Sequence, residues 1–346
     1  MRVGIVNDLR LAAEALRRVV EAAPGLEVAW IARDGAEAVE RCAADRPDVV
    51  LMDLIMPTMD GVEATRRIMR DHPCAILVVT ATVQGNLGKV YEAMSHGALD
   101  AVATPVLGRE GQVTGGEDLV RKIGTVGRLI GRDDSPASAP ARPAARPEER
   151  GGQAPLLAIG SSTGGPGALA TILAALPVDL PAAVILVQHV DAHFAEGLAE
   201  WLDRQSSLRV RPAVKGDRPE IGRVLLAATN DHLVLGSDGR LRYTSDPVKT
   251  PYRPSVDAFF ESAALHADRA GCAVLLTGMG RDGASGLAKL RSLGWHTIAQ
   301  DEATSVVWGM PGAAVKLDAA VEILPIEHVA EHGALALRRL AQGEGP

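Results

Sequence analysis

Three side chains in the second half of the chain are of the types that together perform nucleophilic hydrolysis. Ser162 is the centre of the pentapeptide GSSTG, which has the Gly-x-Ser-x-Gly spacing and follows the apolar run LLAIG. His189 ends the apolar run AAVILVQH, and Asp282 lies in LLTGMGRDG. A serine hydroxyl becomes a good nucleophile when an imidazole takes its proton, and a carboxylate orients that imidazole and stabilises its charged form. These residues therefore predict acyl-transfer chemistry.

Each member of this set also has another interpretation from sequence alone. A glycine-rich turn after a strand can cradle the phosphates of a nucleotide. A histidine at a strand end can be a structural hydrogen-bonding residue, and an aspartate before Gly283 can form a turn. His193 and His232 are further candidates for the base.

A second set of residues, in the first third of the chain, could carry phosphoryl chemistry. Asn7 and Asp8 end the run VGIVND, Asp53 ends DVVLMD, Thr80 ends AILVVT, and Thr104 follows DAVA. Two carboxylates with nearby carbonyl oxygens suit Mg²⁺. Asp53 could then be the nucleophile that carries an acyl phosphate, with the Thr80 hydroxyl bonding a phosphoryl oxygen. Alternatively, Asp8 and Asp53 cap the helices that follow them.

The apolar runs that would position both sets alternate with segments of helical period. Such a pattern is typical of a parallel sheet covered by helices on both faces, so both halves are predicted to be α/β domains. We expect five βα units over residues 1–131 and a flexible Pro/Ala/Arg-rich linker over 132–154. Residues 155–346 are expected to form a doubly wound α/β domain, with a β-hairpin at 231–243 inserted into its sheet.

Composition narrows the class of protein. The 346 residues are 47% hydrophobic and 23% charged, which is a globular balance. A net charge of -7 argues against binding of nucleic acid. The three cysteines are widely separated and lack the spacing of metal ligands, so we expect them to be buried free thiols in a reducing compartment. With no leader peptide and no apolar run long enough to cross a bilayer, we expect a cytoplasmic protein without membrane insertion.

The first domain resembles the receiver domains of two-component systems, on the motifs VNDLR, VVLMDLIMPTMDG, VVTAT and the strand-end TP. The resemblance implies phosphotransfer from a histidine kinase of the CheA type onto Asp53. It also implies Mg²⁺ held by Asp8, Asp53 and the Ile55 backbone oxygen, with Asn7 as a weaker ligand. Receivers usually carry a second acid at the position of Asn7 and a lysine at that of Thr104. The missing lysine removes a cation expected to contact the phosphoryl group.

The second domain is similar to the CheB methylesterase family over nearly all of residues 155–340. The similarity lies in LLAIGSSTGGPGAL, VILVQHV, YRPSVDAFF, LLTGMGRDGASGL and TIAQDEATSVVWGMP. It implies Ser162 as nucleophile, His189 as general base and Asp282 as the orienting carboxylate. Thr163 and the Met279 backbone would line the site, and the esterase would need no cofactor.

The family activity implied by this similarity is hydrolysis of glutamate methyl esters on methyl-accepting chemoreceptor-type proteins, with release of methanol. The family also deamidates selected receptor glutamines, and its receiver packs over the hydrolase cleft until it is phosphorylated. IVND near the start and the Ala-Val-x-Thr-Pro strand end look most like the WspF branch, which serves surface sensing. The alternative function is a catalytically inactive domain that binds receptors as a scaffold or serves as a phosphate sink.

Overall fold

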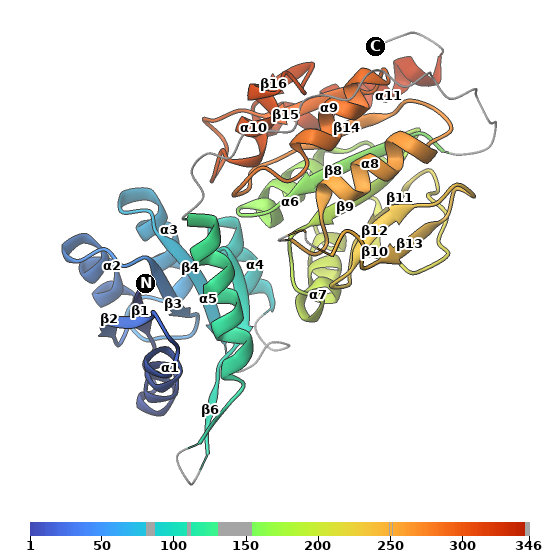
Figure 1. Cartoon of the computed structure of the whole chain (residues 1–346). Coiled ribbons are helices and arrows are strands. Elements are labelled where there is room, and N and C mark those ends of the chain that lie inside the picture. Colours follow the sequence, from blue (N-terminus) through green and yellow to red (C-terminus); the bar gives the residue numbers. More distant parts are fainter. Residues whose placement is uncertain (81–86, 109–111, 131–153, 249, 251, 343–346) are drawn as a thin grey trace. The chain divides into compact units, whose positions relative to one another are not determined.

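The chain folds into two compact units, Met1–Pro136 and Ala137–Pro346 (Figure 1). The computed structural model describes residues 1–80, 87–108, 112–130, 154–248, 250 and 252–342. The linker predicted at 132–154 lies outside the described residues, apart from Ala154.

The N-terminal unit is a five-stranded parallel sheet with the strand order β2-β1-β3-β4-β5. The prediction of five βα units is therefore confirmed. Continuous apolar runs make the central strands, and every residue of β4 is buried. The elements of this unit are β1 (Arg2–Val6), α1 (Arg10–Ala22), β2 (Glu27–Ala32), α2 (Gly35–Ala44), β3 (Val49–Asp53), α3 (Gly61–Asp71), β4 (Ala75–Thr80), α4 (Leu87–Ser95), β5 (Asp100–Ala103), β6 (Val106–Leu107), β7 (Val113–Thr114) and α5 (Gly116–Ile130).

A short antiparallel hairpin interrupts the last βα unit and was not predicted. Its strands β6 and β7 pair Val106 with Thr114 and Leu107 with Val113. Figure 1 shows this hairpin reaching away from the sheet beyond the end of α5. Two residues per strand are too few to give a recognisable alternation in the sequence.

The C-terminal unit is built on a seven-stranded parallel sheet with the order β10-β11-β9-β8-β14-β15-β16. Its elements are β8 (Leu156–Ser161), α6 (Gly165–Ala175), β9 (Ala183–Gln188), α7 (Ala192–Asp203), β10 (Arg209–Pro212), β11 (Arg223–Leu226), β12 (His232–Leu235), β13 (Leu241–Thr244), α8 (Val256–His266), β14 (Cys272–Leu275), α9 (Ala284–Ser292), β15 (His296–Gln300), α10 (Met310–Lys316), β16 (Glu322–Leu324) and α11 (Ile326–Ala341).

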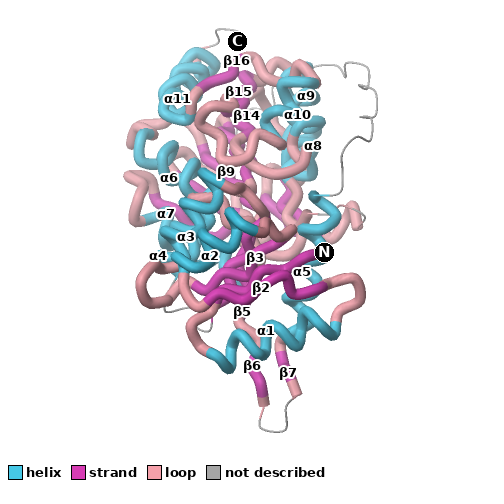
Figure 2. The backbone as a smooth tube through the Cα atoms, turned by 90° about the vertical axis from the view of Figure 1, so that its left-hand side faces the viewer, coloured by secondary structure: helices cyan, strands magenta, loops and turns pink. Residues whose placement is uncertain are grey.

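This sheet is doubly wound around its central strand. From β8 the chain proceeds outward through β9 to β10 and β11, and then crosses over to β14, β15 and β16 on the other side. Helices α6, α7 and α11 cover one face, and α8, α9 and α10 cover the other (Figure 2). The strand order thus reverses between β8 and β14, and in such sheets ligands bind at the carboxyl ends of the strands at this point.

One prediction for this unit is wrong in part. The hairpin expected at 231–243 exists as β12 and β13, but these strands form a separate two-stranded sheet and do not join the parallel one. Leu233 and Leu235 of β12 are buried in the core beside Phe259 of α8. The hairpin therefore buries its apolar side against a helix, which satisfies the hydrophobic pattern as well as insertion into a sheet would.

The remaining expectations on composition concern cysteines and membrane segments. Cys42, Cys74 and Cys272 are buried and form no disulfide. None of the helices within the described ranges is both long enough and apolar enough to span a bilayer.

Candidate active site

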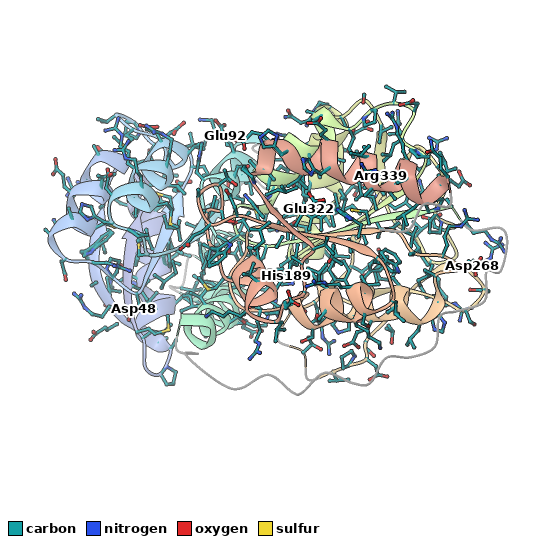
Figure 3. All side chains as sticks on the ribbon, turned by 90° about the horizontal axis from the view of Figure 1, so that it is seen from above. Asp48, Glu92, His189, Asp268, Glu322 and Arg339 are labelled. Atoms are coloured by element: carbon teal, nitrogen blue, oxygen red, sulfur yellow. The ribbon has the colours of Figure 1, made fainter. Side chains whose placement is uncertain are left out.

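Three adjacent strands of the C-terminal sheet end at the predicted hydrolytic residues. Ser162 follows β8, His189 follows β9 on one side of it, and Asp282 lies in the segment after β14 on the other side. Because Ser161 pairs with Gln188, the next residues, Ser162 and His189, leave the sheet at the same level. Figure 3 shows His189 at one end of this domain and Asp268 at the other.

The turn after β8 holds Ser162 in place through its backbone. The Ser162 N–H donates to the Thr277 carbonyl at 3.0 Å, and Gly164 adopts the left-handed conformation (φ 78°) as the N-cap of α6. Gly278 lies so close that an added Cβ would be 2.8 Å from the Ser162 Cβ. A glycine is therefore required beside the nucleophile, and the sharp turn presents Ser162 at the start of a helix.

A buried amide fixes the far side of the same turn. Gln188 Nε2 donates to the carbonyl oxygens of Ser162 (2.8 Å) and His189 (3.1 Å), while Gln188 Oε1 accepts from the Ser161 hydroxyl (2.6 Å). Ser161 and Gln188 are both completely buried. The serine that precedes the nucleophile thus satisfies the one acceptor of Gln188, a role that the sequence did not predict.

His189 and Asp282 form a direct buried pair. His189 Nε2 lies 2.7 Å from Asp282 Oδ2, and the two side chains are 9% and 5% exposed. The other ring nitrogen, Nδ1, is buried and has no hydrogen-bond partner within the described part of the chain. Nδ1 is therefore the nitrogen left to exchange a proton with Ser162, the reverse of the chymotrypsin-type arrangement.

The Asp282 carboxylate is held by the first turn of α8. Oδ1 accepts from the Ser255 hydroxyl (2.8 Å) and the Asp257 N–H (3.1 Å), and Oδ2 accepts from the Val256 N–H (2.6 Å). Burial alone would raise the pKa of Asp282, but the bonds from His189, Val256 and Ser255 outweigh it and lower that pKa. A helix N-terminus favours an anion, so Asp282 stays ionised beside the imidazole.

The other two candidate bases have different roles in the structure. His232 is fully buried, accepts from the Ser255 N–H at Nδ1 (3.1 Å) and contacts the Pro247 carbonyl through Nε2 (3.3 Å). Burial lowers the pKa of His232, which keeps it neutral. His193 is 81% exposed and bonds to Asp191 at the start of α7. Of these three histidines, His189 is the one that pairs with Asp282 and follows the strand next to the one that ends before Ser162.

The two predicted neighbours contribute backbone groups near the nucleophile. The Thr163 carbonyl accepts from the Thr277 hydroxyl at 2.8 Å, and the Met279 carbonyl accepts from the Tyr252 hydroxyl at 3.4 Å. Neither bond uses the N–H group of Thr163 or Met279, and the described residues show no backbone partner for these two N–H groups. Unpaired N–H groups beside a nucleophile are the donors that stabilise an oxyanion.

Four residues of this site were not singled out from the sequence: Gln188, Tyr252, Ser255 and Asp257. Ser255 could have been found, because a serine before a helical segment is a common N-cap. Its hydroxyl does accept from the Ala258 N–H. The other three act through contacts between segments distant in the chain, which no local pattern reveals.

In the N-terminal unit, the predicted acidic residues meet at the ends of β1 and β3. Val6 pairs with Met52, so Asn7 and Asp53 leave the sheet at the same level. Burial raises the pKa of Asp53 and the charge of Asp8 adds to it, although the N–H groups of Leu54 and Ile55 oppose both. Two neighbouring carboxylates under mutual repulsion fit a hard divalent cation.

The alternative that these acids cap helices is excluded. Leu9 is the N-cap of α1, and Asp60 is that of α3. Asn7 Oδ1 accepts from the Leu9 N–H at 2.9 Å at the start of α1. Within the described ranges, no group of three or more His, Cys, Asp or Glu side chains is placed to hold a metal ion.

The two threonines lie at the ends of the next strands. Thr80 is buried at the end of β4, and the Thr104 N–H donates to its carbonyl at 3.0 Å. The nearby Lys89 of α4 donates to Asp60 at 2.8 Å.

Comparison with known families assigns both parts of the chain. Residues 157–332 match the CheB methylesterase family, and residues 3–111 match the response regulator receiver domain. These matches contain both sets of residues described above.

Similar full-length proteins support the same assignment. The chain is 56% identical to protein-glutamate methylesterase/protein-glutamine glutaminase 4 of Burkholderia thailandensis, over 96% of each chain. It is 53% identical to protein-glutamate methylesterase/protein-glutamine glutaminase 3 of Pseudomonas aeruginosa, over 95% of this chain and 98% of that one. The crystal structure of the Thermotoga maritima CheB methylesterase catalytic domain is 36% identical, with a TM-score of 0.50, and covers 53% of this chain and 98% of that one.

Proposed function

The chain belongs to the CheB methylesterase family, and from this premise we propose that it hydrolyses glutamate 5-O-methyl esters on methyl-accepting receptor-type proteins. The observation that carries the proposal is the buried pair of His189 and Asp282 at the strand ends flanking Ser162, with His189 Nδ1 unpartnered among the described residues. Nothing in this site or among the similar proteins supports the alternative of an inactive scaffold.

Acylation begins when Ser162 Oγ attacks the ester carbonyl carbon. His189 Nδ1 accepts the hydroxyl proton, and Asp282 stabilises the resulting imidazolium through Nε2. The N–H groups of Thr163 and Met279 bind the oxyanion. When the carbon–methoxy bond breaks, His189 returns the proton to the leaving oxygen, so that methanol departs and a γ-glutamyl ester of Ser162 remains.

Deacylation repeats these steps with water as the nucleophile. His189 takes a proton from water, the hydroxide adds to the acyl carbon, and the proton passes to Ser162 Oγ as it leaves. The products are the free enzyme and a glutamic acid side chain, which releases its remaining proton to solvent as the carboxylate forms. A glutamine side chain would react in the same way with ammonia as the leaving group, which agrees with the glutaminase in the names of the similar proteins.

We further propose that the receiver controls this activity through phosphorylation of Asp53 by a histidine kinase of the CheA type. Mg²⁺ held by Asp8, Asp53 and the Ile55 carbonyl would neutralise charge on the incoming phosphoryl group. The raised pKa of Asp53, caused by burial and by Asp8, supports a site that gains from such a cation. Thr80 would donate its hydroxyl to a phosphoryl oxygen. These partners imply a cytoplasmic reaction, and membership of the WspF branch remains a prediction.

The direct test is methanol release from a receptor segment that carries glutamate methyl esters. Ser162→Ala is expected to reduce kcat by at least about 10³-fold, because the nucleophile is lost. Ser292→Ala is the matched control, since that exposed hydroxyl bonds to the Lys289 carbonyl of its own helix. Unchanged methanol release by Ser162→Ala would refute the proposal.

The same assay tests the receiver. Adding the kinase, ATP and Mg²⁺ should raise the rate of the unmodified chain and leave that of Asp53→Ala unchanged. A rise that persists in Asp53→Ala would separate the esterase from phosphorylation at this residue.

A further inference from the structure

The segment between β13 and α8 places an aromatic ring on the catalytic imidazole. The rings of Tyr252 and His189 are stacked, with centroids 4.2 Å apart and planes inclined by 10°. We propose that Tyr252 is a positioning residue for His189, and that it favours the charged form of the imidazole during the reaction. The inference rests on the proposed function in that His189 must be the general base.

The stack supplies a constraint that the Asp282 bond cannot. The hydrogen bond from Asp282 fixes the position of Nε2, but an imidazole held at one atom can still tilt about that contact. A parallel ring on one face fixes the plane, and with it the direction in which Nδ1 points. Because His189 Nδ1 has no partner in the described structure, the stack and the Asp282 bond are what hold the nitrogen that must meet Ser162.

Tyr252 is itself held at its far end. Its hydroxyl donates to the Met279 carbonyl at 3.4 Å. A Cβ added to Gly280 would lie 2.5 Å from the Tyr252 hydroxyl oxygen. The loop after β14 therefore approaches the hydroxyl closely at a glycine. One side chain thus touches both the base and the residue whose N–H is the proposed oxyanion donor.

The electronic effect follows from the charge on an aromatic face. The face of a tyrosine ring is negative and attracts a cation lying over it, most strongly where water is excluded. His189 is only 9% exposed at the side chain, so the imidazolium formed in each half-reaction gains from this contact. The stack therefore stabilises the transition state more than the ground state.

The test compares Tyr252→Leu, which keeps apolar bulk but loses the ring, with Tyr252→Phe, which keeps the ring but loses the hydroxyl. Tyr252→Leu should lower kcat about 10-fold, the rate equivalent of a desolvated cation–π contact. KM should change by less than about 2-fold, because the lost contact acts on the transition state. Tyr252→Phe should keep kcat within about 3-fold of the unmodified chain, because the stack remains.

A pH profile distinguishes positioning of the base from a general loss of structure. In Tyr252→Leu the acidic limb of kcat/KM should move to lower pH, because the imidazolium has lost a stabilising neighbour. Tyr243→Phe is the control, since its hydroxyl accepts from the Ala228 N–H and donates to the Ala213 carbonyl in the core. That variant should lower Tm and leave the acidic limb in place.

The assays use both the methyl-esterified receptor segment and p-nitrophenyl acetate. Failure of the first substrate with turnover of the second would overturn the proposed function and still test Tyr252. An independent readout is the NMR signal of the His189 ring in the full chain, identified by its loss in His189→Gln. It should show an upfield ring-current shift that disappears in Tyr252→Leu and persists in Tyr252→Phe.

Two results would overturn the proposal. One is a Tyr252→Leu enzyme with unchanged kcat and an unchanged pH profile. The other is an equal loss of kcat in Tyr252→Phe and Tyr252→Leu, which would assign the effect to the hydroxyl and the Met279 loop rather than to the stacked ring.

Discussion

Asp282 and Asp257 are joined through the first turns of two helices. Asp282 accepts a hydrogen bond from the start of α8, where Asp257 lies, and Asp257 accepts one from the start of α9, which follows Asp282. Asp282 Oδ1 accepts from the Asp257 N–H at 3.1 Å in the first turn of α8, and Asp257 Oδ1 accepts from the Gly286 N–H at 2.7 Å in the first turn of α9. The N-cap of α9 is Gly283, directly after Asp282. The catalytic carboxylate is thus part of a reciprocal cap that joins two helices.

This arrangement makes stability depend on the protonation of Asp257. Burial and the charge of Asp282 raise the pKa of Asp257 to about 7. The folded state therefore binds a proton that the unfolded chain releases near pH 4, so this stabilising contribution is present at low pH and lost as pH rises through about 7.

Asp257→Asn should abolish the pH-dependent part of the stability that comes from Asp257, and it keeps an acceptor for the Gly286 N–H. Calorimetry should show a smaller fall in the Tm of the C-terminal domain between about pH 5 and pH 8 than in the unmodified chain. Glu261→Gln, which removes a weaker charge acting on Asp257, should change the slope less. Parallel Tm curves for all three chains would mean that Asp257 does not titrate in this range.

Ser255 links the helix cap to the catalytic carboxylate. Its hydroxyl donates to Asp282 and accepts from the Ala258 N–H. Ser255→Ala should lower the free energy of unfolding by about 1–3 kcal/mol, because a cap and a buried acceptor lose their partner. Ser255→Ala should also lower kcat. Ser255→Thr keeps the hydroxyl and should retain most of the stability and most of kcat. Denaturant titration and methanol release measure the two effects, and a fully active, stable Ser255→Ala would contradict this role.

Gly278 leaves the space in which Ser162 sits. Gly278→Ala would place a Cβ 2.8 Å from the Ser162 Cβ and 2.3 Å from Met310 Sδ, so the turn must shift. We expect esterase activity to fall by at least about 10²-fold, because a displacement near 1 Å misaligns the reacting atoms. Gly333→Ala in α11 is the matched control: its Cβ would make ordinary contacts of 3.7 Å or more, and helix propensity should raise stability slightly. Active Gly278→Ala would contradict the argument.

Thr104 stands where receivers usually carry a lysine, and the pKa of Asp53 is raised by burial and by the charge of Asp8. Thr104→Lys should increase the fraction of chain phosphorylated by a small-molecule donor such as acetyl phosphate, because an added ammonium stabilises the phosphoryl oxygens. Phosphate-affinity gels would measure it, with Asp53→Ala as the unreactive control. An equal or lower phosphorylated fraction would show that the native pocket does not lack a cation.

The central strands and the meeting of Ser162, His189 and Asp282 were predictable for one physical reason. Continuous apolar runs such as AILVVT can only be satisfied inside a sheet covered on both faces, and parallel strands end at a common edge. The edge strands β10 and β16 were missed because RVRP and EIL are short and partly charged.

The finer geometry of the site was beyond prediction because it depends on contacts between distant segments. Asp282 receives bonds from residues 255–257, and Tyr252 stacks on His189 across 63 positions of the chain. No local pattern encodes which ring nitrogen of His189 faces Asp282. The placement of the β12–β13 hairpin against α8 likewise depends on core packing rather than on its own alternation.

The order of the strands also determines when during protein synthesis the esterase can exist. Ser162 and His189 are translated early in the second domain, but Asp282 and the Gly286 amide that completes the reciprocal cap come after the chain has built the far edge of the sheet. A nascent chain that ends before β14 therefore holds a serine and a histidine with no carboxylate between the helices. Such a chain should be inert on the ribosome, and esterase activity should appear only after the segment through Gly286 has emerged.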